Sequence, residues 1–184
     1  QAQAIDWSQH ALGPVGGWPA TLRAALRLAA VYPDPAVVFV GEQFIVLFND
    51  AVMPSWGAQA AEVFGRPLFE VFPEVEDQRE WFVRAWSGEP VPLAPHHVLY
   101  FRRTAALTRG WFQQTLTPLR DEHGTVLGVL VVVTDRSEQV LASRRLATLS
   151  ELAAAATGRG RHEALDAALA RLAESEDVTF ALAY

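Results

Sequence analysis

Residues 110–135 read GWFQQTLTPLRDEHGTVLGVLVVVTD, and this stretch decides the fold of the chain. Two runs rich in β-branched and aromatic residues flank a polar turn that ends at Gly124. Such a pattern predicts a β-hairpin. The second run stops at Thr134-Asp135, and a charged segment with helical spacing follows it. We therefore expect a strand that leads directly into a helix.

Three more strand-like runs lie upstream of this hairpin. Residues 36–40 and 44–48 flank a short turn and predict a second hairpin. Residues 96–103 read as a further strand, and 104–110 read as a loose loop. Five strands with sequence-adjacent pairs at each end predict an α+β fold with a five-stranded antiparallel sheet.

Helical patterns lie before and between these strands. Apolar residues recur at helical spacing over 19–31, which predicts an amphipathic helix. Residues 50–64 carry short helical pieces that Pro and Gly interrupt, and prolines bound a short helix within 64–73. A longer helix is expected over 74–87, with Phe82, Ala85 and Trp86 facing inward.

The segment after Asp135 has a different pattern. Its small and apolar residues recur in steps of four and three, which is the spacing of a coiled-coil seam; the residues are Ala142, Leu146, Leu149 and Ala153. We expect a helix over 136–157 that pairs with a second copy of the chain. A second helical face follows, and 178–184 read as a strand without a partner, so we expect the sequence to continue into another domain.

Composition excludes several classes of function. The chain has 184 residues and no Cys, which excludes disulfides, thiolate metal sites and a flavin–cysteine adduct. Its net charge is −6 and its arginines are scattered, so we expect no nucleic-acid partner. The apolar runs fall short of the ~20 residues that cross a bilayer, so we expect no membrane span.

Residues 33–135 resemble a PAS domain. The resemblance rests on the first hairpin, which ends at Phe48-Asn49, on FGRPLFEVFP at 64–73, and on TPLRDEHG at 117–124 with its exit VTD at 133–135. Family members typically show Asp-Ile-Thr at the exit, and this chain matches that motif only at Asp135. The resemblance implies strand order 2-1-5-4-3, helices over one face, a cleft that can hold a small molecule, and output through the helix after the last strand.

The flanking segments carry two further resemblances. The tryptophans, glycines and prolines of 7–19 are similar to the extension that precedes PAS domains in bacterial multidomain sensor kinases. Residues 162–184 look like the start of a GAF domain. The expected division is an extension at 1–32, a PAS domain at 33–135, a signalling helix at 136–158 and the start of a GAF-like domain at 159–184. Such a cytoplasmic two-component sensor would send its signal to a histidine kinase domain.

The resemblance also assigns faces to the hairpin. It places Trp111, Gln113 and Thr115 toward the cleft, together with alternate valines of the last strand, and leaves Phe112, Gln114 and Leu116 on the other side. The candidate cleft residues are Phe39, Phe48, Asn49, His97, Leu99, Phe101, Trp111, Gln113, Thr115, Val131 and Val133. Two interpretations stay open, a polar ligand held among apolar groups or a core that the chain's own side chains fill.

The sequence requires no cofactor, and it does not identify one that the chain could bind. His97 shares its strand face with Leu99 and Phe101, and an inward His is in principle a haem ligand. The helix at 74–87, where a haem-binding PAS domain could place its His, contains none, so we expect neither haem nor a metal site. Asn49 ends a strand and could cap the next helix or form hydrogen bonds across the fold.

The sequence leaves three functions open. The first is a sensory module that forms a homodimer through its helices and acts on an output domain in the same chain. The second is a ligand-free dimerisation scaffold. The third is a small enzyme, and it is the weakest because no nucleophile–base pair or metal cluster is visible in the sequence.

Overall fold

The structure is a computed structural model that describes residues 5–57, 60–103, 106–157 and 160–173. For residues 55, 94–103, 106–109, 155–156 and 161 it describes the backbone alone. The chain divides into two compact units, Gln1–Asp135 and Arg136–Tyr184. Each unit is described by itself.

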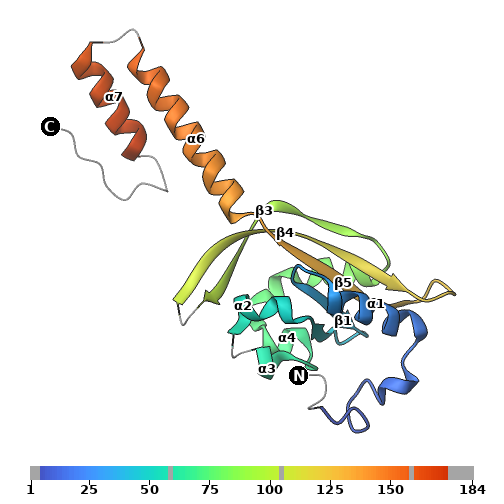
Figure 1. Ribbon diagram of the computed structural model, residues 1–184. Coiled ribbons are helices and arrows are strands. Elements are labelled where there is room, and N and C mark those ends of the chain that lie inside the picture. The colour runs from blue at the N-terminus through green and yellow to red at the C-terminus, as the bar shows by residue number, and fades with distance from the viewer. Residues whose placement is uncertain (1–4, 58–59, 104–105, 158–159, 174–184) are drawn as a thin grey trace. The chain divides into compact units, whose positions relative to one another are not determined.

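The first unit is built on a five-stranded antiparallel sheet (Figure 1). Its strands are β1 (Ala36–Val40), β2 (Ile45–Phe48), β3 (Val91–Arg103), β4 (Ala106–Arg120) and β5 (Val126–Asp135). Their order is β2-β1-β5-β4-β3, so the α+β class and the strand order implied by the resemblance are confirmed.

The expectation of a loop at 104–110 is wrong for residues 106–110, the part that the structure describes. β4 begins at Ala106, which pairs with Arg103, and the pairing with β3 continues from there along both strands. The sequence of this segment has no strand periodicity of its own, but backbone hydrogen bonding to a long neighbouring strand holds it extended. Residues 104–105 lie outside the described part of the chain.

The helices of this unit are short because Pro and Gly interrupt them. They are η2 (Val15–Gly17), α1 (Ala20–Val31), η3 (Asp50–Val52), α2 (Met53–Trp56), α3 (Ala60–Val63), α4 (Leu68–Val71), η5 (Pro73–Gln78) and α5 (Arg79–Trp86). The helix expected over 74–87 is therefore a 3-10 segment followed by an α-helix. Phe82 and Ala85 are buried and Trp86 is half-buried, as the pattern predicts.

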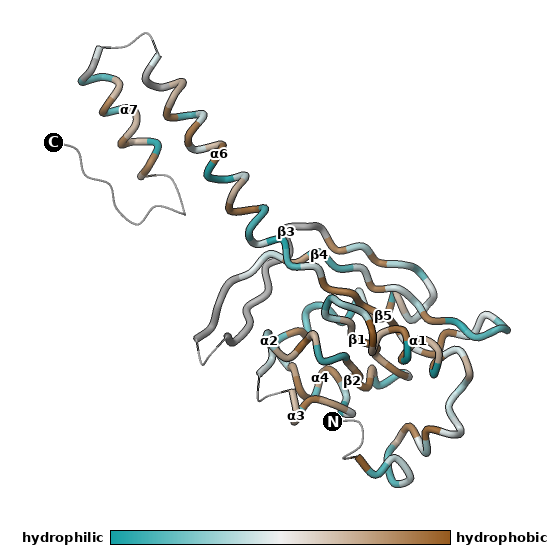
Figure 2. Tube along the Cα trace, viewed as in Figure 1, coloured by the Kyte–Doolittle hydropathy of each residue, from teal (hydrophilic) through white to brown (hydrophobic). Residues whose placement is uncertain are grey.

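Both faces of the sheet are covered by other parts of the unit. Figure 2 shows hydrophobic residues along the central strands. Every residue of β1 is buried, because one face packs against α2–α5 and the other against α1 and the N-terminal segment. This explains why β1 reads as an unbroken apolar run instead of alternating. The N-terminal extension is thus part of this unit's core.

β1 and β5 approach each other closely at Gly128. A Cβ atom on Gly128 would lie 2.5 Å from the carbonyl oxygen of Phe39, which is a backbone atom that cannot easily move. Gly128 pairs with Val40 at the end of the β1–β5 ladder. Glycine is therefore needed at this position for the two central strands to pair.

The second unit contains two helices, α6 (Ser137–Ala156) and α7 (Arg161–Ala173), which pack against each other. Arg171 of α7 donates to Glu151 of α6 at 2.7 Å. The strand expected at 178–184, which the resemblance gives as the first strand of a GAF-like domain, lies outside the described residues. Over the described ranges, no helix combines the length and the apolar character needed to cross a bilayer.

Candidate functional site

The candidate site is the region between the sheet and the helices α2–α5, where the resemblance places the cleft and where buried side chains pack as one core cluster. Val131 of β5 lies opposite Val37 of β1 and Leu116 of β4. Directly opposed residues of an antiparallel pair share a face of the sheet. The register therefore brings four expected cleft residues to the face that α2–α5 cover. They belong to one core cluster and are Phe39, Phe48, Val131 and Val133.

Aromatic rings fill part of this cleft. Phe82 of α5 packs edge-on against Phe39 at 5.0 Å, Phe44 at 5.4 Å and Phe69 at 5.7 Å between ring centroids. Edge-to-face rings at such distances are a favourable arrangement. Phe82 therefore links the sheet to the helices at the centre of the core.

A second aromatic group lies beside β2. Phe48 packs edge-on against Trp56 and against Phe64, each at 5.0 Å, and Trp56 lies 5.2 Å from Phe72. Phe48 thus borders both the cleft cluster and the segment that leads to α4. It connects the two ends of the helical layer.

The expected faces of β4 are reversed. Leu116 lies opposite Val131 and Gln114 lies opposite Val133, so the residues on the cleft side are Phe112, Gln114 and Leu116. Gln113 and Thr115 are exposed on the other side, and Trp111, although buried, belongs to that side too. The placement of Trp111, Gln113 and Thr115 in the cleft is therefore wrong. The half-buried Gln114 is the polar residue that sequence reasoning missed.

Three candidates on β3 fall where the structure describes the backbone alone. The backbones of His97, Leu99 and Phe101 pair with Phe112, Gly110 and Thr108, after a register irregularity between Leu93 and His97. Their side chains lie outside the description, so their part in the cleft stays a prediction. In the described part of the chain, no three His, Asp or Glu side chains gather to hold a metal ion.

Asn49 is buried, and its side chain turns to the backbone of the N-terminal segment. Its Nδ2 lies 3.0 Å from the carbonyl oxygens of Ala29, Tyr32 and Asp34, and its Oδ1 accepts from the Ala36 N–H at 3.0 Å. It makes no side-chain cap to the following 3-10 helix. These backbone groups already use its amide, which gives Asn49 a structural role, and its part in ligand binding stays a prediction.

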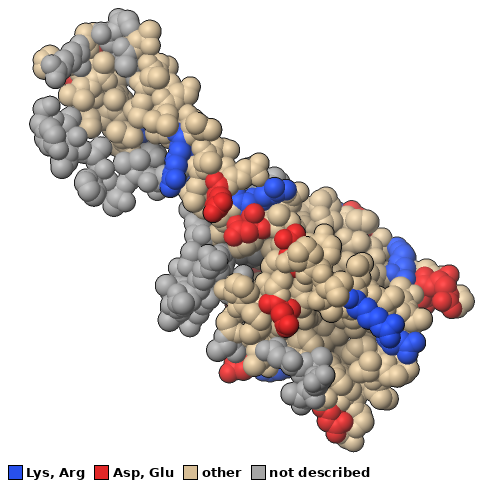
Figure 3. Space-filling model, viewed as in Figure 1, with Lys and Arg blue, Asp and Glu red and all other residues tan. Residues whose placement is uncertain are grey.

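An exposed pair of charged residues lies at the start of α5. The guanidinium of Arg79 lies 3.7 Å above the centre of the Phe69 ring and donates to Glu76, with Nη2 and Oε2 2.9 Å apart. This hydrogen bond lowers the pKa of the Glu76 carboxyl and raises the pKa of Arg79. Both side chains are exposed, so their pairing adds little stability. On the face of the molecule that Figure 3 shows, the charged side chains are scattered among uncharged ones.

The expected seam on α6 is exposed. Leu146 and Leu149 are 67% and 61% accessible, and Ala142 and Ala153 are exposed too. The half-buried residues of α6 lie at other positions, among them Leu141, Thr148 and Leu152. The seam is therefore a separate apolar stripe, left open within the described part of this unit.

Comparison with known proteins supports the resemblance. A family profile described as the PAS fold matches residues 30–141, more than half of the chain. The chain belongs to the PAS family. No protein of curated function matches the sequence.

Several solved structures share the PAS fold with this chain. An RNA-binding light-oxygen-voltage receptor is 22% identical over 76% of this chain, with a TM-score of 0.52, and the match covers 40% of that receptor's length. The phage VqmA–DPO complex is 16% identical over 88% of this chain and 83% of its own, with a TM-score of 0.51. A LOV protein of Rhodobacter sphaeroides is 12% identical over 82% and 89%, with a TM-score of 0.50. Identities this low show the fold alone.

Proposed function

We propose that this chain is a non-enzymatic, cytoplasmic sensory module of a bacterial signalling protein. In this proposal its PAS cleft binds a small molecule or a partner, and α6 carries the change to an output domain of the histidine kinase type. The observation that carries the proposal is the exit of β5. The strand ends at Asp135 and α6 begins at Ser137, so a single residue, Arg136, separates the sheet from the helix.

The position of β5 supports this route. It lies between β1 and β4 at the centre of the sheet, and Val131 and Val133 point to the cleft side near its end. A ligand that displaces Val133 acts two residues before the strand stops. A differential affinity of a few kcal/mol is enough to shift a two-state equilibrium of this kind.

The ligand would bind at the end of the cleft that holds Gln114 and Val133. The ring of Phe82 and the rings that it contacts occupy the centre of the core. Gln114 is the half-buried polar residue on the cleft face of β4. A mostly apolar site with one amide that fixes orientation is typical of small-molecule pockets.

Hydrogen exchange of the α6 amides tests the proposed route. We expect Val133→Trp, which enlarges a cleft-facing side chain, to change exchange over residues 137–145. The matched control is Val132→Trp on the opposite face of the same strand, which should change it much less. Equal exchange of α6 in the wild type and in Val133→Trp, with both folded, would contradict the proposal.

The ligand-free scaffold is the second candidate, and the aromatic packing around Phe82 favours it. Native mass spectrometry of the gently purified chain separates the two functions. A bound small molecule that Gln114→Trp displaces supports sensing. A ligand-free dimer in which Val133→Trp does not change the hydrogen exchange of the α6 amides supports the scaffold.

A further inference from the structure

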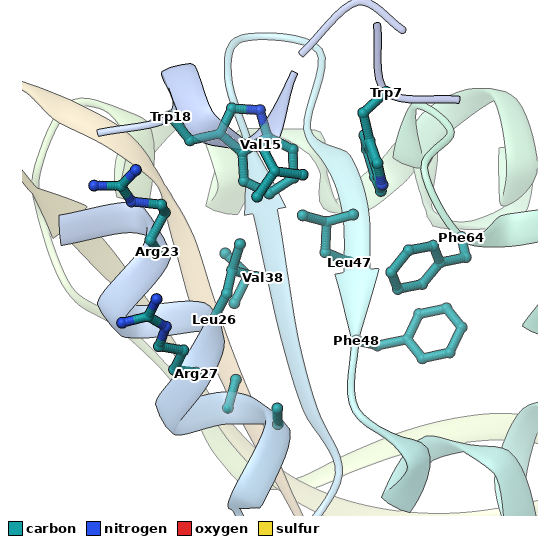
Figure 4. A pocket seen from close by; sticks show the side chains of 12 residues that line it. Trp7, Val15, Trp18, Arg23, Leu26, Arg27, Val38, Leu47, Phe48 and Phe64 are labelled. Carbon is teal, nitrogen blue, oxygen red and sulfur yellow. The ribbon is translucent and has the colours of Figure 1, made fainter. Parts of the chain in front are cut away.

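An apolar pocket lies on the face of the sheet that α1 covers (Figure 4). α1, the N-terminal segment and the strands β1 and β2 line it, it is partly open to solvent, and its volume is about 330 Å³. Small-molecule sites typically measure roughly 300–1,000 Å³. Val38 and Leu47 line it from the sheet and are buried, while Gln114 and Val133 are not among its lining residues.

Hydrogen bonds and ring contacts hold the aromatic walls of this cavity. The Trp18 Nε1–H donates to the carbonyl oxygens of Leu12 at 2.8 Å and Gly13 at 3.1 Å. Trp7 packs edge-on against Trp18 at 5.1 Å and against Phe64 at 6.3 Å. Because the indole N–H of Trp18 already has partners, its ring offers apolar surface. These walls are therefore formed before any ligand binds.

Two arginines of α1 line the cavity at one side. Arg23 and Arg27 are four residues apart, so they lie one turn apart on the same face of the helix. In Figure 4 their guanidinium groups extend away from Trp7 and Phe64. Arg23 Nη1 donates a hydrogen bond to the Gly16 carbonyl oxygen at 3.1 Å. Among the described residues, Arg27 forms no ion pair.

The charge around this cavity differs from that of the chain. The net charge of the chain is −6, yet α1 carries two arginines and no acidic residue, and no Asp or Glu lines the cavity. An apolar space with cationic groups at one side is complementary to a molecule with an apolar body and an anionic head. Arg matches a carboxylate well, since its fork of N–H groups can bind both oxygens.

We propose that this cavity binds a free aliphatic carboxylic acid. The carboxylate lies at Arg23 and Arg27, and the chain runs over Val38 and Leu47 toward Trp7 and Phe64. The site shares Phe48 with the cleft-side core cluster, but its other lining residues belong to the opposite side of the sheet or to the N-terminal segment and α1. Its ligand contacts therefore do not depend on the proposed sensory function. It gives the N-terminal extension a binding role of its own.

Calorimetric titration of the full chain with decanoate tests the site. We expect saturable binding, with decanol, the uncharged analogue, binding at least about tenfold more weakly because it lacks the charge-assisted hydrogen bonds. Arg23→Gln with Arg27→Gln should weaken decanoate about tenfold or more and leave decanol unchanged. The matched control is Arg66→Gln with Arg145→Gln, two exposed arginines whose loss changes the net charge equally and should leave decanoate affinity unchanged.

Two further variants locate the ligand. Ala30 is an exposed lining residue, so Ala30→Trp should obstruct the cavity and reduce binding, whereas Gln114→Trp in the cleft should not. Absence of saturable binding, equal affinity for decanoate and decanol, or loss of binding in Gln114→Trp alone would overturn the proposal. If Ala30→Trp turned a dimer of the chain into a monomer, the cavity would be the contact surface for a second copy, and this result would overturn the proposal too. None of these results changes the α6 exchange test, so the two proposals fail separately.

Discussion

The side-chain amide of Asn49 donates a hydrogen bond to the backbone carbonyl oxygen of Ala29, 20 residues away in the chain, at 3.0 Å. The same amide nitrogen lies 3.0 Å from the carbonyl oxygens of Tyr32 and Asp34. Asn49 thus fastens the last turn of α1, and the loop after it, to the end of β2. One buried side chain connects the N-terminal extension to the sheet.

Asn49→Ala should destabilise the chain by about 2–4 kcal/mol, because it leaves several buried backbone groups without their partner. Urea unfolding followed by circular dichroism measures the change. Gln43→Ala, in the exposed turn between β1 and β2, is the control and should change stability little. A loss below about 0.5 kcal/mol for Asn49→Ala would show that water replaces the amide.

Asn49→Asp gives a pH-dependent version of the same prediction. A carboxylate would face three carbonyl oxygens, so the pKa of the new Asp is raised in the folded state. A raised carboxyl pKa means that folding is destabilised at neutral pH and that stability is recovered as pH falls through the folded pKa. Urea midpoints of Asn49→Asp and wild type should converge at acidic pH. A gap that is constant with pH would contradict this charge-based account.

Phe82→Ala should remove about 3–5 kcal/mol of stability, which is the usual effect of deleting a buried ring. Phe82 contacts three other rings and is 6% exposed, so the cavity left behind cannot easily be refilled. Val83→Ala, the exposed neighbour on the same helix, should change stability by less than about 0.5 kcal/mol. Similar losses for the two variants would mean that the ring cluster contributes little.

Gly128→Ala should weaken the pairing of β1 with β5. The added methyl group would meet the Phe39 carbonyl oxygen, and a clash with backbone costs about 1–3 kcal/mol or more. Gly17→Ala is a suitable control, because a Cβ there has open space around it. Hydrogen exchange should rise along 36–40 and 126–135 in Gly128→Ala alone. Unchanged exchange in these strands would show that they accommodate the methyl group and remain paired.

The sequence predicts much of the sheet because its hairpins are local. The β1–β2 and β4–β5 hairpins have recognisable turns, and the segment 117–135 has the strand alternation of a known family. The faces of β4 were also readable, since Phe112 and Leu116 are apolar while Gln113 and Thr115 are polar. The apolar set faces the core, as alternation alone would have indicated.

The rest of the site depends on contacts that no local pattern encodes. His10 reaches the Gly65 carbonyl oxygen at 2.6 Å across 55 residues, and Trp7 packs against Phe64. Such contacts place the N-terminal extension on the outer face of the sheet and create the cavity beside α1. The tryptophans and prolines of the extension signal loops, but the surface they cover is decided by the tertiary fold.

The exposed stripe on α6 provides the last prediction, which concerns the proposed dimer. Leu146→Asp with Leu149→Asp should convert a dimer into a monomer of 20.2 kDa, because each Asp would place a charge in an apolar seam. Light scattering after size exclusion, at several concentrations, measures the mass. Ser143→Asp with Ser150→Asp adds the same charge at exposed positions off the seam and should leave the dimer intact. A monomeric wild type at every concentration, or a double Leu variant that stays dimeric, would show that α6 does not pair the subunits through this stripe.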